Sequence, residues 1–417
     1  MDNFGTLYKT EIKKILLKRS VWIMLIIGMA LMILSNLSDI IPFGGEMKVG
    51  LPDGTFMTAY EVVETQKNIG ESISGEKIDD ELLAKMRFDI STFLSDKQEL
   101  NYEGRNASET YPGIWFAARK LGYEDLLTKL YTQFQSAEDI NAVLMECTAE
   151  DYYRTVRNNL NFSFEHDELN EEEKAYWYEK YDSQEKPVNY EYAAGYNSFA
   201  QSFHVYIWFV FLLISISLAG EFSDETAYRT DAVILSSRNG RKPICKAKLC
   251  AGITVAIAEL VIVLAVNMAV CLGVYGNSGW NAPLLMIIQS TAWNITVGQA
   301  VSILIGLALI LSVLFSLFTM LISQISGKSV TVMAVQFAVF FIGLFEFPYD
   351  LGLITKLWNI RPTNFLMNYS FMEYKLFKVG GQYLNEFQMA GILYPIIIAI
   401  ALPVIYISYQ RMMLKSR

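Results

Sequence analysis

The sequence predicts a mainly α-helical, polytopic membrane protein with six transmembrane helices and a large, mostly helical extracytoplasmic domain between spans one and two. Composition is the first reason, because 53% of the 417 residues are hydrophobic and only 18% are charged, which is apolar for a soluble protein. Charge is the second, because residues 44–200 carry 31 acidic and 15 basic side chains, a net charge of −16. The third is a set of six apolar stretches, each close in length to the roughly 20 residues that a helix needs to cross a bilayer. They are residues 20–40, 203–219, 249–274, 299–323, 329–347 and 391–409.

Residues 1–19 are predicted to form a cytoplasmic amphipathic helix before span one. Lysines occupy its other faces, while one broad face carries the apolar side chains Phe4, Tyr8, Ile12, Ile15 and Leu16. This pattern is typical of a helix that lies in the membrane interface. A plain helical extension of span one is the alternative, since no helix breaker separates the two segments. Span one itself is too long for a signal peptide, and no small-residue cleavage pattern follows it.

The acidic segment, residues 41–202, is long enough to fold as a separate extracytoplasmic domain. Its apolar residues recur near helical spacing, as in Leu82, Leu83, Met86, Ile90 and Phe93, which predicts helices. The run Glu171–Glu173 raises the question of a cation site, but we interpret it as a solvated helix face. Cys147 is the only cysteine of this domain, which excludes a disulfide within it.

Basic residues predict that both chain termini are cytoplasmic. They precede span one, lie between spans two and three and between spans four and five, and follow span six, as with Lys9, Arg229, Lys328 and Arg411. All these groups fall on one side of a six-span chain, and the positive-inside rule makes that side the cytoplasm. Residues 348–390 are then extracytoplasmic or interfacial, and residues 410–417 form a cytoplasmic tail.

The largest cytoplasmic feature is the loop of residues 220–248, which contains "EFSDETAYRTDAVILSSRNGRKPICKAK". A short helix is predicted over residues 223–236. Asp224 and Glu225 lie in its first turn, where the helix dipole favours acidic side chains. Asn239 and Gly240 favour a turn after it, and Pro243 is suited to the first turn of span three.

This loop resembles the cytoplasmic loop of ABC transporter permeases of the type-2 exporter class. The family pattern is matched at Glu221, at Glu225 with Thr226, at Leu235 with Ser236, at Arg241 and at Lys248. Two positions depart from it, because Arg238 stands where proline is common and Gly240 where serine is common. The resemblance covers the membrane part of the chain and does not identify the extracytoplasmic domain.

The resemblance implies a coupling helix that docks into a groove of a separate ATPase subunit. The residues assigned to this coupling are Glu221, Glu225, Tyr228, Arg229, Ile234, Leu235, Arg238, Arg241 and Lys248. It also implies two ATPase subunits per complex, a second six-span permease of the same or another sequence, and a bacterial cell membrane. ATP and Mg²⁺ would be bound by the ATPase subunit, and no cofactor by this chain. An ordinary basic loop that only fixes the topology is the alternative.

Polar residues inside the predicted spans are candidates for a substrate path. An ionisable side chain at this depth is costly and is expected to face protein or water. The candidates are Glu259, Asn267, Ser312, Ser316, Thr319 and Gln336. They would line a cavity or a dimer seam, or alternatively form the hydrogen bonds by which membrane helices pack.

Catalytic and metal sites are not predicted. His166 and His204, the two histidines, do not have the spacing of a zinc protease. "SGKS" at residues 326–329 lacks the earlier glycine of a phosphate-binding loop, because Ile322 stands there. We interpret this glycine and lysine as the end of a span.

The predicted function is the permease subunit of an ABC exporter that moves an amphipathic substrate, such as a peptide antibiotic or a lipid, out of or away from the membrane. Resistance to antimicrobial peptides would follow from such transport. Two alternatives are a secondary transporter or channel, and a membrane-anchored extracytoplasmic sensor or interaction module. Membrane lipid is an expected partner, and no nucleic-acid partner is expected.

Overall fold

The computed structural model describes residues 4–38, 40, 49–50, 56–95, 147–228, 230, 234, 242–288, 290–345, 352–363 and 371–415, with ten positions between 114 and 130. The chain is mainly α-helical, as predicted. Within this described part, five helices are long and apolar enough to cross a membrane. They are α2 (Arg19–Asn36), α10 (Ala194–Leu218), α13 (Lys242–Tyr275), α14 (Val297–Ser326) and α17 (Glu386–Lys415). The chain therefore has the character of a multi-pass membrane protein.

The predicted fifth span corresponds to a shorter helix. Helix α15 (Ser329–Gly343) has 15 residues, and at 1.5 Å per residue it is about 22 Å long. That is less than the roughly 30 Å of a bilayer core. The apolar stretch of residues 329–347 is therefore longer than the helix that forms within it.

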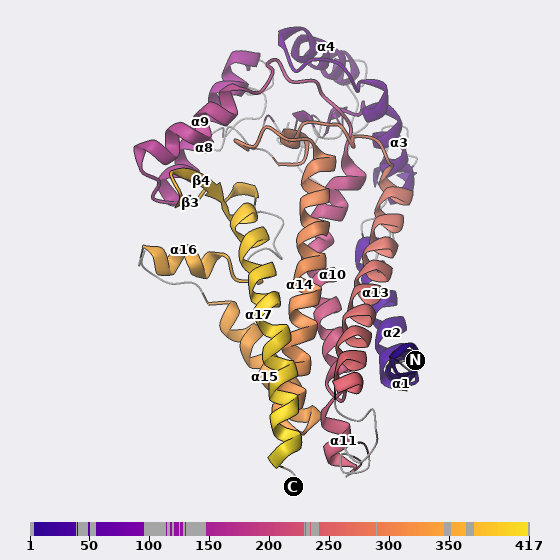
Figure 1. Cartoon of the computed structure of the whole chain (residues 1–417). Coiled ribbons are helices and arrows are strands. Elements are labelled where there is room, and N and C mark those ends of the chain that lie inside the picture. Colours follow the sequence, from indigo (N-terminus) through magenta and orange to yellow (C-terminus); the bar gives the residue numbers. More distant parts are fainter. Residues whose placement is uncertain are drawn as a thin grey trace.

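The long helices run side by side and separate two ends of the molecule (Figure 1). The first end, here called the α11 end, carries α1 (Phe4–Leu16), α11 (Ser223–Ala227) and the C-terminus. The second, here called the α4 end, carries α3 (Ala59–Ser72), α4 (Asp80–Ser95), α8 (Ala149–His166), α9 (Glu171–Asp182) and the β3–β4 hairpin. Both chain termini thus lie toward the same end of the bundle.

The described part of the chain also contains two antiparallel pairs of short strands. Strand β1 (Val49–Gly50) pairs antiparallel with β2 (Phe56–Met57), and β3 (Leu376–Val379) pairs antiparallel with β4 (Gln382–Asn385). The β3–β4 turn is Gly380–Gly381, and both residues have positive φ angles of 58° and 85°, which glycine adopts without strain. Short helices also occur at α16 (Leu353–Asn359) and in the 3₁₀ turn η1 (Leu284–Met286).

Helix α10 is the centre of the bundle and packs against α2, α13 and α14. Gly28 of α2 permits one close approach, because a Cβ atom there would lie 2.1 Å from the Phe209 ring of α10. Aromatic rings of Phe211, Phe315 and Phe340 join α10, α14 and α15. The ring centroids of Phe211 and Phe315 are 4.6 Å apart, and those of Phe315 and Phe340 are 5.3 Å apart. A close backbone approach at Gly28 and packed aromatic rings thus join the helices of the bundle.

The helices of the α4 end start at well-formed caps. Thr58 and Glu61, Thr148 and Asp151, and Asn170 and Glu173 each form a reciprocal pair of side-chain and backbone hydrogen bonds. Such capping boxes satisfy backbone N–H groups that the first helical turn leaves without partners. These caps fix where α3, α8 and α9 begin.

Helix α9 is joined to the C-terminal part of the chain by an aromatic junction, defined here as Trp177, Trp293, Phe371, Tyr374 and Phe387. The Trp177 ring lies 5.1 Å from that of Trp293 and 5.2 Å from that of Tyr374. Its indole Nε1 donates a hydrogen bond of 2.6 Å to the carbonyl oxygen of Tyr374. The junction ties the helical domain of the α4 end to the start of α17.

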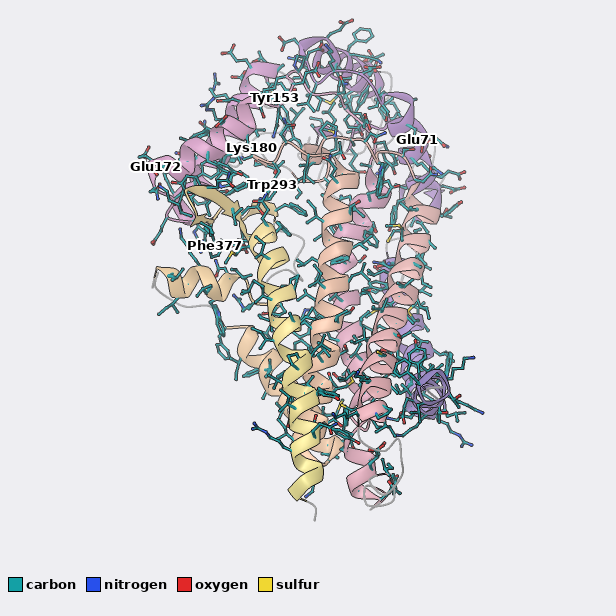
Figure 2. The ribbon with its side chains drawn as sticks, viewed as in Figure 1. Glu71, Tyr153, Glu172, Lys180, Trp293 and Phe377 are labelled. Atoms are coloured by element: carbon teal, nitrogen blue, oxygen red, sulfur yellow. The ribbon has the colours of Figure 1, made fainter. Side chains whose placement is uncertain are left out.

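The acidic run at the start of α9 is only partly solvated, so our interpretation of it was wrong for Glu173. The Glu173 side chain is buried and accepts a 2.8 Å hydrogen bond from Lys356 of α16. Glu172 stays exposed and pairs with Lys378 of β3 at 2.9 Å, at the outer edge of α9 (Figure 2). The run therefore docks α9 onto α16 and the hairpin.

Candidate functional site

A buried cluster of charged side chains lies at the α11 end, and Lys248 is at its centre. The Lys248 Nζ atom lies 2.8 Å from a Glu225 oxygen, 3.2 Å from a Glu11 oxygen and 3.5 Å from a Glu221 oxygen. It also donates a 2.8 Å hydrogen bond to the carbonyl oxygen of Glu221. The side chains of Lys248 and Glu221 are 0% exposed. We call Lys248, Glu11, Glu221 and Glu225 the Lys248 cluster.

Three of its members come from the segment between α10 and the first turns of α13. Glu221 follows α10, Glu225 is in α11, and Lys248 is two turns into α13. Helix α13 already begins at Lys242, so residues 242–248 belong to a helix and not to the loop that we predicted to end at residue 248. Pro243 lies in the first turn of this helix, as predicted.

Helix α14 fixes the corner between α10 and α11. The hydroxyl of Ser323 donates a 2.6 Å hydrogen bond to the carbonyl oxygen of Ala219. It accepts hydrogen bonds from the backbone N–H groups of Phe222 and Ser223, at 3.2 Å and 3.1 Å. A carbonyl group at the end of α10 and two N–H groups at the start of α11 are thus satisfied by a side chain of a neighbouring helix.

The fourth member, Glu11, comes from α1, which lies across the bundle and is seen nearly end-on in Figure 1. Helix α1 ends at Leu16 and α2 begins at Arg19, so the N-terminal segment is a separate helix and not an extension of α2. Ile15 and Glu11 are buried on its inner face. Tyr8 adds a hydrogen bond of 2.9 Å from its hydroxyl to that of Thr254 in α13.

Two further lysines surround the cluster. Lys14 lies 3.2 Å from Glu11 and 3.7 Å from Glu225. Lys18 lies 3.8 Å from Asp224 and donates a 3.1 Å hydrogen bond to the carbonyl oxygen of Ser217. Helices α1, α10, α11 and α13 are thereby joined by ion pairs and hydrogen bonds around one buried ammonium group.

Glu11 makes the docking of α1 sensitive to acid. Burial opposes the ionisation of Glu11, but Lys248 and Lys14 outweigh it and hold the pKa of this carboxyl below its usual value of 4.5. A carboxyl with a lowered pKa stabilises the fold above its unfolded pKa, and this contribution is lost as the pH falls through the lowered value.

We therefore expect the wild-type chain to lose stability relative to the Glu11→Gln variant as the pH falls below 4.5. The difference between their melting temperatures, measured in detergent micelles from neutral pH into that range, checks this. A difference that stays constant throughout would show that the Glu11 charge contributes nothing to the docking of α1.

The predicted coupling residues divide into three groups. Glu221, Glu225 and Lys248 come together, but they face inward, so they position α11 and do not offer a surface to another protein. Tyr228, one residue after α11, is 77% exposed. Ile234 is partly exposed, and Arg229, Leu235, Arg238 and Arg241 lie outside the described residues. Within the range 223–236 that we predicted as a helix, α11 covers Ser223–Ala227, and Ile234 is also helical.

The predicted path residues of α13 have partners within the chain. The carboxylate of Glu259 accepts a short hydrogen bond from the hydroxyl of Ser217 on α10. Asn267 accepts hydrogen bonds of 2.7 Å from the side-chain amide of Asn36 on α2 and of 3.2 Å from the hydroxyl of Ser202 on α10. These polar contacts join α2, α10 and α13 in the middle of the bundle.

The path residues of α14 and α15 are also buried, on another side of α10. The hydroxyls of Ser312, Ser316 and Thr319 donate to carbonyl oxygens one turn earlier in α14, at 2.8–2.9 Å. Gln336 of α15 donates a short hydrogen bond to Thr319. The three hydroxyls are thus satisfied within α14, and only the bond from Gln336 to Thr319 joins two helices, as the helix-packing alternative requires. A role for any of the six residues in a substrate path stays a prediction.

Glu259 permits a test of these alternatives. Glu259→Gln keeps the side-chain volume and an oxygen that accepts from Ser217, so we expect normal expression and an unchanged melting temperature. If the chain transports a substrate and this carboxyl lines the path, we expect the transport rate, or the pH dependence of that rate, to change in the variant. Transport assays on the reconstituted variant across pH check this. An unchanged pH profile would leave Glu259 with a packing role only.

"SGKS" forms the turn between α14 and α15. Gly327 follows the last residue of α14 with a left-handed φ of 61°, the usual conformation of a residue that ends a helix. A helix therefore precedes this sequence, where a phosphate-binding loop follows a strand. Among the described residues, no group of three or more His, Cys, Asp or Glu side chains is placed to hold a metal ion.

No protein-family model, curated protein or solved structure matches this chain. A functional assignment therefore has to come from the arrangement of its own side chains.

Proposed function

We propose that this chain is the membrane-spanning permease subunit of an ABC exporter, and that its α11 end faces the cytoplasm and binds a separate ATPase subunit. Lys9, Lys13, Lys242 and Lys246 are exposed near this end, and the positive-inside rule places such residues in the cytoplasm. Both termini would then be cytoplasmic, in the cell membrane of a bacterium.

The observation that carries the proposal is the Lys248 cluster. It joins α11, the short helix expected to meet the ATPase, to α1 and to the long helices α10 and α13. Separating a buried ion pair leaves uncompensated charges and costs several kcal/mol, on the order of 3–5. A displacement of α11 is therefore expected to carry α1 and both long helices with it, which is what transmission from an ATPase into the membrane requires.

Six crossings are part of the proposal, although α15 is short. Helix α14 ends toward the α11 end, whereas α17 starts toward the α4 end (Figure 1). The residues between them must therefore traverse the bilayer thickness, and α15 supplies most of that distance. Helix α16 exposes Leu353 and Ile354, and we place it in the outer leaflet.

The complex would contain two ATPase subunits and a second six-span permease, identical or not. Helices α2 and α17 expose most of their apolar surface, which lipid and the second permease would cover. ATP and Mg²⁺ would be bound by the ATPase subunits. An amphipathic substrate, such as a peptide antibiotic or a lipid, suits a path between apolar helices and a large external domain.

The experiment that tests this function is reconstitution of the chain in proteoliposomes with ABC ATPase subunits of the cell that makes it. We expect ATP-dependent movement of an amphipathic substrate, and ATP hydrolysis that depends on the presence of the chain. A secondary transporter or channel would move substrate without the ATPase. A sensor module would bind its ligand and transport nothing.

A further inference from the structure

Helix α2 lies at the edge of the bundle, beside α13 (Figure 1). In its apolar part, 17% of the residues are buried, against 72% in α10 and 50% in α13. Large apolar side chains such as Ile26 and Leu31 are exposed. Little of the surface of α2 is therefore held by the rest of the chain.

Apolar contacts alone do not fix such a helix in a bilayer. Lipid tails are as apolar as leucine side chains, so membrane helices associate through close packing and hydrogen bonds. The close packing of α2 is at Gly28, which lies against the Phe209 ring of α10. Among the described residues, its polar contacts with other helices lie at its two ends.

The first end of α2 is anchored near the Lys248 cluster. Lys18, the residue before α2, donates a 3.1 Å hydrogen bond to the carbonyl oxygen of Ser217 in α10 and lies 3.8 Å from Asp224 of α11. The indole Nε1 of Trp22 donates a 2.7 Å hydrogen bond to the carbonyl oxygen of Leu16, the last residue of α1. Helix α1 is itself tied to α13 by the cluster, so this end moves only if buried ion pairs separate.

The second end of α2 is joined to the bundle through its last residue, Asn36. The side-chain Nδ2 of Asn36 donates hydrogen bonds of 2.7 Å to Asn267 and of 2.9 Å to the hydroxyl of Tyr206. It also lies 3.4 Å from the sulfur of Cys271. The hydroxyl of Tyr275 donates a hydrogen bond of 3.4 Å to the Asn36 carbonyl oxygen. These neutral contacts are weaker than the ion pairs at the first end.

A polar surface of α10 and α13 lies behind Asn36. The side-chain oxygen of Asn267 also accepts a 3.2 Å hydrogen bond from Ser202. Its Nδ2, in contrast, is buried and has no hydrogen-bond partner among the described residues. A buried donor without an acceptor costs free energy. The position of α2 against α10 and α13 is therefore not fully stabilised at this end.

We propose that α2 is a gate whose second end moves away from α10 and α13 while its first end stays anchored, and that Asn36 is the latch that closes it. The open position exposes Ser202, Asn267 and Cys271, and it gives the Asn267 amide access to an acceptor. A polar surface that opens toward lipid suits the polar part of an amphipathic molecule. The inference goes beyond the proposed function and requires only that these helices lie in a bilayer.

The test measures how fast N-ethylmaleimide labels each cysteine of the full chain in lipid nanodiscs, without any ATPase, with mass spectrometry to identify the labelled residue. Each rate is divided by that of the same cysteine in the unfolded chain. Cys245 and Cys271 are both on α13 and both 0% exposed, so a rigid bundle protects them equally. We expect Cys271 to react at least about tenfold faster than Cys245, because only the end of α13 that carries Cys245 is held by buried ion pairs.

Asn36→Leu removes the latch and is expected to raise the rate at Cys271 about tenfold, with the rate at Cys245 unchanged. The control Ser35→Leu, at the exposed neighbouring position, is expected to react as the wild type does. Equal rates at Cys271 and Cys245 in the wild type, or an unchanged rate at Cys271 in Asn36→Leu, would overturn the proposal. A rise at both thiols together with a lower melting temperature would also overturn it, because Asn36 would then stabilise the whole bundle.

Discussion

Replacement of Lys248 by methionine is expected to lower the free energy of unfolding of the chain by about 3–5 kcal/mol, the usual effect of removing one partner from a buried ion pair. Methionine fills a similar volume but leaves Glu11, Glu221 and Glu225 near one another without their shared ammonium group. Lys248 is fully buried, so water cannot take its place without opening the bundle. Thermal and denaturant unfolding of the purified chain in detergent micelles measures this loss.

Lys246→Met is the matched control, because Lys246 lies two residues away on the exposed face of the same helix. Its effect is expected to stay within about 0.5 kcal/mol, as for most surface substitutions. Adding Glu225→Gln to Lys248→Met removes one of the clustered carboxylates and should restore part of the stability. If Lys248→Met unfolds at the same midpoint as Lys246→Met, the ion pairs do not hold this end of the bundle together.

Trp177→Ala is expected to destabilise the α4 end by about 3–5 kcal/mol, the range for large aromatic side chains in a core. Trp177 is 1% exposed, and it contacts Trp293 and Tyr374 in the aromatic junction. Its loss opens a cavity and leaves the carbonyl oxygen of Tyr374 without its indole donor. Helices α8 and α9 should then separate more readily from the hairpin and α17.

Limited proteolysis of the helical domain at the α4 end, together with the melting temperature, measures this effect. Phe162→Ala serves as control, because Phe162 is a large aromatic residue of α8 that is 72% exposed. We expect the Trp177 variant to be cut many times faster than the control at equal protease concentration. Equal rates of cleavage would mean that the aromatic junction does not hold α9 in place.

Much of the helical architecture could be predicted from the sequence, because spans and amphipathic helices leave local patterns. The apolar run of residues 249–274 identified α13 without any knowledge of its partners. The limit of such patterns is visible at α15, where apolar residues continue after Gly343 but the helix does not. The composition of a segment shows that its residues can enter a membrane, but it does not show at which residue the helix ends.

Long-range contacts could not be predicted in this way. Glu11 and Lys248 are 237 positions apart, so nothing near Glu11 marks it as a buried residue rather than a solvated one on an amphipathic helix. The resemblance singled out Lys248 and the two loop glutamates as coupling residues, but it implied contacts with another protein. Glu173 was assigned to a solvated face for the same reason, since its partner Lys356 lies in a distant segment.

If the segment around α11 binds an ATPase subunit, replacement of Tyr228 is expected to weaken that binding. This residue is 77% exposed immediately after α11, and exposed tyrosines are frequent among the residues that dominate protein interfaces. The measurement is the affinity of the purified chain for ABC ATPase subunits of the cell that makes it, compared between wild type, Tyr228→Ala and the control Phe162→Ala. We expect Tyr228→Ala to weaken binding by about 1–3 kcal/mol, roughly 5- to 150-fold, with an unchanged melting temperature and an unaffected control. Wild-type affinity in Tyr228→Ala, or no binding of the ATPase by the wild-type chain, would contradict the account.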